Sequence, residues 1–180
     1  LAAKRLNGYI PDMPFLYDRL TPVEFFGFTG DLYSIPRARV LERERELFAL
    51  FGLQECRAAL IKDLSHGMRQ RVIYAATFLH EPRILFVDEP LIGLDPHSIR
   101  LVKDLLVRHA RAGMTVFLTT HILPVAESIA DRVGIIAGGK LIALGAPRDL
   151  LAHHGGKDLE AVFLQLTEGE DATCLSSALS

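Results

Sequence analysis

The chain has 180 residues, 49% of them hydrophobic and 23% charged, with a formal net charge of -2. This length suffices for one sizeable core, and the near-neutral charge excludes a global attraction to nucleic acid or anionic lipid. The longest apolar runs are strand-sized, far short of the roughly 20 residues that span a bilayer. Cys56 and Cys174 lie far apart, which indicates buried or free thiols in a reducing compartment and no metal site. The first residue is Leu1 and no signal-peptide pattern follows, so we expect a fragment whose front part is missing.

The segment from about residue 21 to 80 is predicted to be mostly helical. Thr21 and Glu24 have the spacing of a capping box at a helix start. The apolar residues of Pro36–Phe51 recur at helical spacing. Ser65 is suited to cap a further helix.

The pattern then changes to short apolar runs that alternate with helical segments. Such alternation predicts an α/β protein with a mostly parallel sheet, and apolar strands favour a sheet covered on both faces. Gly138 and Gly139 predict a hairpin turn between the last two strands. The tail after Thr167 is small and polar, and we expect it to fray. The predicted strands are Arg83–Asp88, Thr115–Thr119, Val133–Ala137 and Lys140–Leu144, and the predicted helices are Pro96–Ala112 and about 123–131.

Two adjacent carboxylates, Asp88 and Glu89, follow a buried strand. Carboxylates are costly to bury without a cation or donor, and the carboxyl ends of parallel strands commonly carry the sites of α/β proteins. One carboxylate can hold Mg²⁺ and the next can orient an attacking water. The pair alone fits equally well a structural role in the turn before Pro90.

Two further positions are suited to phosphate contacts. Ser65 and Gly67 stand at a helix start, where backbone N–H groups and the helix dipole favour an anion, although by themselves they more often form a simple cap. His121 follows the strand Thr115–Thr119 and can donate to a phosphate, although such a residue alone is more often a surface or capping residue.

The order and spacing of these features resemble the nucleotide-binding domain of ABC transporters over nearly the whole chain. Five core motifs occur in order, with the Walker B motif about 20 residues after the signature. The Asp158–Leu164 segment also resembles a helix that closes this domain in bacterial exporters. The matching segments are the Q-loop at Gly8–Asp12, the LSGGQ-like signature at Leu64–Met68, Walker B with its catalytic glutamate at Ile84–Glu89, the D-loop at Gly93–Asp95 and the switch histidine at His121.

The resemblance implies a P-loop ATPase-type fold with a mostly parallel sheet, incomplete in this chain, and an inserted helical subdomain. It divides the chain into a helical signature subdomain (about 13–80), a catalytic α/β core (about 81–154), and a C-terminal helix and tail (about 155–180). It also implies that a strand outside these residues lies between Thr115–Thr119 and Val133–Ala137.

The resemblance implies that the chain belongs to the ATP-hydrolysing subunit of a membrane transporter, and it favours an exporter over an importer. The implied ligands are ATP and Mg²⁺. The domain would lie on the cytoplasmic face of the membrane and form a head-to-tail dimer with a second such domain. Phe15, Leu16 and Tyr17 would face the transmembrane subunits, and no nucleic acid is expected as a partner. The implied roles are Mg²⁺ binding for Asp88, polarisation of water for Glu89, contact to the γ-phosphate for His121, contact to the partner domain's ATP for Ser65, His66, Gly67 and Met68, and crossing of the dimer interface for Asp95.

Several residues depart from the family pattern. His66 replaces the first glycine of the signature, and Met68 replaces its glutamine. Asp12 stands where the Q-loop glutamine would be, and an acid there repels phosphate yet can bind Mg²⁺ or water. No G-x-x-x-x-G-K-[ST] loop occurs in the sequence, so we expect these residues alone to be inactive. Two alternatives stay open, a non-transport ABC ATPase and a catalytically silent ABC module.

Overall fold

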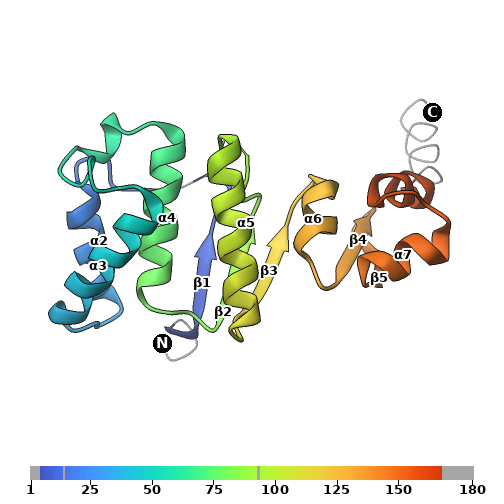
Figure 1. The fold of residues 1–180 in the computed structure, drawn as a ribbon, viewed down its shortest axis with the longest axis horizontal. Coiled ribbons are helices and arrows are strands. Elements are labelled where there is room, and N and C mark those ends of the chain that lie inside the picture. The colour runs from blue at the N-terminus through green and yellow to red at the C-terminus, as the bar shows by residue number, and fades with distance from the viewer. Residues whose placement is uncertain (1–4, 14, 93, 168–180) are drawn as a thin grey trace. The chain divides into compact units, whose positions relative to one another are not determined.

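The computed structural model describes residues 5–13, 15–92 and 94–167 (Figure 1). The chain divides into two compact units, residues 1–119 and 120–180. The first unit contains β1 (Asn7–Ile10), α2 (Pro22–Leu32), α3 (Arg37–Phe51), a 3₁₀ turn (Ile61–Asp63), α4 (His66–Leu79), β2 (Ile84–Asp88), α5 (Pro96–Arg111) and β3 (Thr115–Thr119). The second contains α6 (Leu123–Ile129), β4 (Val133–Ala137), β5 (Lys140–Gly145), α7 (Pro147–His154) and a last helical segment, 159–167.

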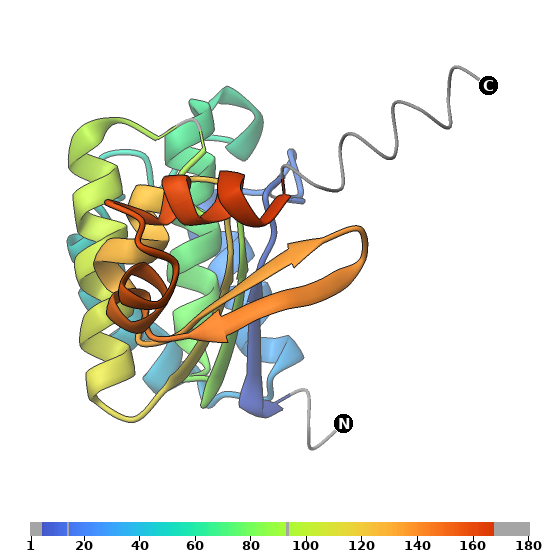
Figure 2. The same ribbon diagram turned by 90° about the vertical axis from the view of Figure 1, so that its right-hand side faces the viewer.

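The first unit is built on a parallel sheet with the strand order β1-β2-β3. Its register places Ile10 beside Val87 and Asp88 beside Thr119, so the carboxyl ends of the strands share one edge. Helix α4 contacts β1 and helix α5 contacts β3, and both lie on the same side of the sheet (Figures 1 and 2). This arrangement confirms the predicted α/β class and the strands at 84–88 and 115–119.

The two faces of this sheet differ in exposure. Leu85 and Val87 are buried beneath the helices, at 0% and 2% exposure. Tyr9, Phe86 and Phe117 point to the opposite face and are 59%, 40% and 59% exposed. The expectation of a sheet covered on both faces is therefore wrong for the described residues, because α4 and α5 cover one face only.

The helices α2, α3 and α4 form the predicted helical segment and lie next to one another in Figure 1. The predicted capping box is confirmed, since the Thr21 side chain accepts from the N–H of Glu24 and the Glu24 side chain accepts from the N–H of Thr21. The aromatic rings of Phe26 and Phe48 meet edge to face at 5.4 Å between centroids. These contacts hold α2 against α3 in the core of this layer.

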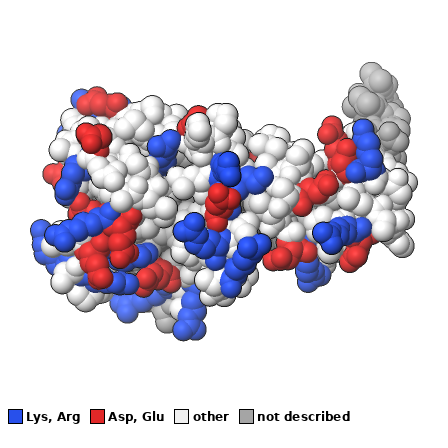
Figure 3. Space-filling model, in the orientation of Figure 1, with Lys and Arg blue, Asp and Glu red and all other residues white. Residues whose placement is uncertain are grey.

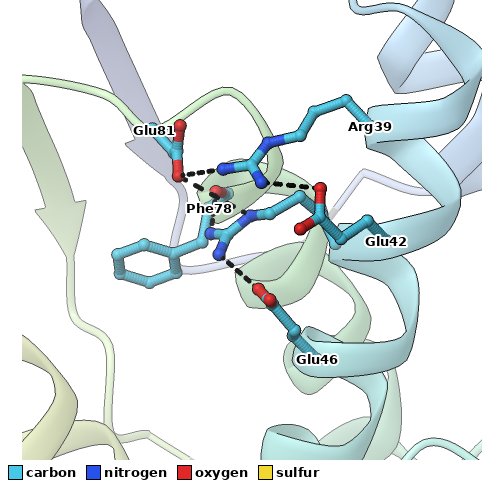
Figure 4. Close-up of polar contacts among 6 residues, drawn as sticks. Arg39, Glu42, Glu46, Phe78 and Glu81 are labelled. Carbon is cyan, nitrogen blue, oxygen red and sulfur yellow. Dashed lines mark hydrogen bonds and ion pairs between the residues drawn. The ribbon is translucent and has the colours of Figure 1, made fainter.

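Ion pairs tie α3 to the loop between α4 and β2 (Figure 4). Arg39 contacts Glu81 at 3.0 Å, and Arg43 contacts the same carboxylate at 3.8 Å. Arg43 also donates from Nη2 to the carbonyl oxygen of Phe78 at 3.1 Å, near the end of α4. Figure 3 shows basic and acidic side chains interleaved over the part of the molecule formed by α2 and α3, so no patch of one sign forms there.

The second unit contains the predicted hairpin. Strands β4 and β5 pair antiparallel, and Gly138 and Gly139 join them with φ of 53° and 74°, as a two-residue turn of type I′ requires (Figure 2). Leu150, Leu159 and Val162 are buried within this unit, at 6%, 1% and 0% exposure. The segment 159–167 is helical, which confirms the helix predicted from Asp158–Leu164.

Among the described residues, β3 pairs with β2 alone and β4 pairs with β5 alone. The strand expected between β3 and β4 stays a prediction. Within the same residues, no helix has the length and apolar character needed to cross a membrane. Cys56 is a buried free thiol, as predicted. Cys174, the tail after Thr167 and Gly93 of the D-loop lie outside the described residues.

Candidate functional site

Strand β2 brings Asp88 and Glu89 to the carboxyl edge of the sheet, where both are half-buried. The Oδ1 atom of Asp88 accepts a hydrogen bond from the hydroxyl of Thr119 on β3, at 2.5 Å. Glu89 has a φ of 46°, a left-handed conformation that is uncommon outside glycine. Its N–H donates to the carbonyl oxygen of Thr119 at 3.0 Å. The sharp turn at the acidic pair is thus fixed to the neighbouring strand.

The backbone after the acidic pair is anchored on α4. The buried phenol of Tyr74 donates to the carbonyl oxygen of Pro90 at 3.3 Å. Burial raises the pKa of Tyr74, so the phenol stays a neutral donor. The turn itself is closed by the backbone, with the N–H of Ile92 donating to the carbonyl oxygen of Glu89 at 3.4 Å. The described side-chain hydrogen bond of Asp88 goes to Thr119 on β3.

The signature segment forms the start of α4. The hydroxyl of Ser65 accepts from the N–H of Met68 at 3.3 Å, which confirms the predicted cap. Ser65 and His66 are exposed, and Gly67 and Met68 are half-buried. A methyl group added to Gly67 would meet only Leu94, at 3.9 Å, so the side of Gly67 where a side chain would lie is open. Open backbone N–H groups at the start of a helix are suited to an anion.

Asp95 of the D-loop caps α5. Its Oδ1 atom accepts from the N–H groups of His97 and Ser98 at 3.0 Å and 3.1 Å. Its Oδ2 atom accepts from the Ser98 hydroxyl at 2.5 Å and from Arg71 at 3.3 Å. Hydrogen bonds from the side chain and backbone of Ser98, with a smaller contribution from the charge of Arg71, lower the pKa of Asp95 to about 2. The carboxylate is therefore ionised at neutral pH.

The two remaining predicted site residues lie in different units. Asp12 follows β1 and is half-buried, at the same carboxyl edge as Asp88 because β1 and β2 are parallel. His121 is exposed and stands near the start of the second unit, ahead of α6.

The first unit brings the predicted signature and D-loop together, through the neighbours Gly67 and Leu94 and through the bond from Arg71 to Asp95. Three contributors were not among the predicted site residues: Thr119, Arg71 and Ser98. Thr119 has a signal in the sequence, since a hydroxyl residue ends the strand next to the acidic pair. Arg71 and Ser98 have none, because neither spacing nor residue type shows that their helices meet.

An exposed aromatic cluster, Phe15, Tyr17 and Phe28, lies on the segment after Asp12 and on α2. Phe15 and Tyr17 are 82% and 48% exposed, and the rings of Tyr17 and Phe28 meet edge to face at 5.4 Å. Leu16 is only 7% exposed, so the expectation that it faces a partner is wrong. Its side chain joins the core of the first unit because the segment alternates between inward and outward positions.

Comparisons with known proteins agree on the kind of domain. A model of the family described as "AAA domain, putative AbiEii toxin, Type IV TA system" matches residues 16–126. The ABC-type transporter ATP-binding protein EcsA of Bacillus subtilis is 33% identical over 166 residues, which cover 91% of this chain and 67% of EcsA. The daunorubicin/doxorubicin resistance ATP-binding protein DrrA of Streptomyces peucetius is 41% identical over 159 residues, covering 88% of this chain and 48% of DrrA.

A solved structure of an ATP binding subunit of an ABC transporter superimposes with a TM-score of 0.85 at 31% identity. The alignment covers 91% of this chain and 69% of that subunit. The chain spans about half the length of the first curated relatives it matches.

Proposed function

Because the chain belongs to the family of ATP-binding proteins of ABC transporters, we propose that it supplies the catalytic and signature parts of an ATPase domain that drives a membrane transporter. The observation that carries the proposal is the acidic pair Asp88 and Glu89, fixed at the carboxyl edge of a parallel sheet by Thr119. The similarity to DrrA, which is named for drug resistance, favours an exporter.

ATP binding requires a phosphate-binding loop, and the sequence contains no G-x-x-x-x-G-K-[ST]. We infer that such a loop comes from sequence outside these residues. A domain in which these residues are joined to that loop is called the complete domain below. The backbone N–H groups and lysine of that loop supply most of the affinity for the phosphates. These residues alone should therefore bind Mg-ATP with a dissociation constant above about 10 μM.

The chemistry of Asp88 fits Mg²⁺. Carboxylate and hydroxyl oxygens, here those of Asp88 and Thr119, are ligands of the hard kind that Mg²⁺ prefers. The described residues contain no group of three or more His, Cys, Asp or Glu side chains placed to hold a metal. Such a sparse set is compatible with Mg²⁺, which is usually bound by one or two carboxylates together with waters and substrate phosphates. When bound, the ion would neutralise charge on the phosphates.

Glu89 and His121 take the roles closest to the reaction. Glu89 orients and polarises the water that attacks the γ-phosphate, and its fixed turn keeps the carboxylate at the edge where the phosphate would lie. His121 donates to the γ-phosphate and stabilises the charge that develops on it.

The exposed start of α4 acts on a second nucleotide. Ser65, His66, Gly67 and Met68 contact the ATP bound by a partner domain in a head-to-tail dimer, and backbone N–H groups at the start of this helix act as donors. Asp95 reaches across the same dimer interface.

We propose that the aromatic cluster is the contact surface for the transmembrane subunits and that the domain lies on the cytoplasmic face of the membrane. Exposed aromatic side chains that touch one another are typical anchors of protein interfaces. Replacing Phe15 with Ser should weaken binding of the complete domain to detergent-solubilised transmembrane subunits about tenfold or more. Basal ATP hydrolysis should stay unchanged, since Phe15 lies outside the catalytic residues. Unchanged binding would contradict this docking surface.

One observation favours a second candidate, a catalytically silent module of the same family. Asp12 lies at the carboxyl edge of the sheet, where a negative charge repels phosphate. In that case the chain would bind a partner domain and hydrolyse nothing.

ATP hydrolysis by the complete domain separates these candidates. The reference domain should hydrolyse Mg-ATP, and Glu89→Gln should lower turnover on the order of 10²-fold or more while sparing nucleotide binding. Glu55→Gln, a change of the same kind at an exposed position, is the control and should leave turnover intact. A reference domain that binds ATP without hydrolysing it would establish the silent module.

A further inference from the structure

Arg71 joins the signature helix to the D-loop. It lies on α4 one turn after the signature residues, and its Nη2 atom donates to the Ser98 hydroxyl at 2.6 Å and to Oδ2 of Asp95 at 3.3 Å. The Ser98 hydroxyl donates in turn to the same oxygen of Asp95 at 2.5 Å. These three side chains, the Arg71–Asp95–Ser98 triad, form a closed hydrogen-bonded set between the start of α4 and the start of α5.

The surroundings of Arg71 fix its guanidinium in this place. Ser98 is 2% exposed, and the side chain of Arg71 is 28% exposed. A methyl group added to Gly52, at the end of α3, would lie 3.5 Å from Nη1 of Arg71. The Nε atom of Arg71 is buried and has no hydrogen-bond partner among the described residues. The hydrogen bonds from Nη2 to Asp95 and Ser98 therefore set the position of this group.

A second, apolar contact joins the same two segments. Leu94 is the nearest neighbour of the open side of Gly67, at 3.9 Å from where a methyl group would lie. The first half of α4 and the D-loop are therefore joined twice, by Gly67 with Leu94 and by Arg71 with Asp95. A segment held at two points moves with the helix that holds it.

We propose that Arg71 is a positioning residue that fixes the D-loop to the signature helix of its own subunit. The two segments that face the partner's ATP then approach it as one rigid body. Arg71 touches no nucleotide in this arrangement and acts through Asp95. The inference rests on the proposed function, because the dimer with a shared ATP belongs to that proposal.

Steady-state hydrolysis by the complete domain, with matched variants, tests the role. Arg71→Met keeps the length of the side chain and removes its charge, and it should lower kcat about tenfold with KM changed by less than about twofold. Arg71→Lys retains one charged donor and should recover most of the lost kcat. Arg100→Met, the same change at an exposed arginine of α5, is the control and should leave kcat unchanged.

A double-mutant cycle of Arg71→Met with Ser98→Ala distinguishes a positioning role from a simple loss of stability. Ser98→Ala should lower kcat several-fold by itself, and it should add nothing to Arg71→Met, because both changes open the same triad. If Arg71→Met fails to fold, Ser98→Ala and Arg71→Lys still decide the outcome. Folded variants with normal kcat, or losses of kcat that multiply in the double variant, would overturn the positioning role alone. Absence of hydrolysis in the reference domain would refute the proposed function, and the positioning role with it.

Discussion

Replacing Gly67 with Ala separates the packing of the signature glycine from its role in binding. The residue lies in the first turn of α4, and an added methyl group would meet only Leu94 at 3.9 Å, an ordinary contact distance. Alanine in a helix is favoured over glycine by about 0.5–1 kcal/mol. The free energy of unfolding should therefore rise by up to about that amount. In a domain of this size such a gain raises the melting temperature by about 1–4 °C.

Turnover should move in the opposite direction. The methyl group would cover the backbone N–H groups that we propose face the partner's ATP, and kcat should fall about tenfold or more. Denaturant titration and steady-state ATP hydrolysis measure the two quantities on the same preparation. Gly27→Ala in α2 is the matched control, since nothing lies within 4 Å of the added methyl group. It should raise stability equally and leave kcat unchanged. A less stable Gly67→Ala protein, or one with full turnover, would refute the reasoning.

Gly8→Ala should lower the unfolding free energy by about 1–3 kcal/mol, because the added methyl group would lie 2.8 Å from Thr77, 2.9 Å from Leu85 and 3.0 Å from Pro82; unchanged denaturation would contradict this packing. The stability that Asp95 contributes should be complete above about pH 4 and be lost as pH falls toward its folded pKa of about 2. In Asp95→Asn, the free energy of unfolding should not show this loss between about pH 4 and pH 2. The same dependence of unfolding free energy on pH in the variant and the reference protein would contradict this role of Asp95. His121→Ala in the complete domain should cost turnover about 3 kcal/mol with a smaller effect on binding. A lower melting temperature with intact specific activity would support a capping role instead.

Features that depend on neighbouring residues could be predicted from the sequence. The capping box at Thr21, the hairpin at Gly138 and Gly139, and the strand before Asp88 are all set by residues close in the chain. Strand β1 has only four residues, too few for a clear pattern, and it has no counterpart among the predicted strands. The open face of the sheet could not be predicted, because apolar strands such as that of Phe86 do not reveal whether a second layer covers them.

In the candidate site, too, some residues could be predicted from the sequence and others could not. Asp88, Glu89 and Ser65 stand out by residue type at the end of a strand or the start of a helix. The contacts that hold them come from residues far away in the chain: Thr119 is 31 positions from Asp88, and Arg71 is 24 positions from Asp95. Only the packing of the helices and the strand register bring such pairs together.

The claim that this chain presents its signature to the ATP of a second domain is tested most directly by sedimentation velocity of the complete domain carrying Glu89→Gln. Blocked hydrolysis should trap the closed state, so Mg-ATP should convert monomers to dimers and ADP should not. Ser65→Arg, which places a bulky side chain at the exposed start of α4, should abolish the dimer while nucleotide binding persists. A Glu89→Gln domain that binds Mg-ATP and stays monomeric, or a dimer that Ser65→Arg leaves unchanged, would contradict the account.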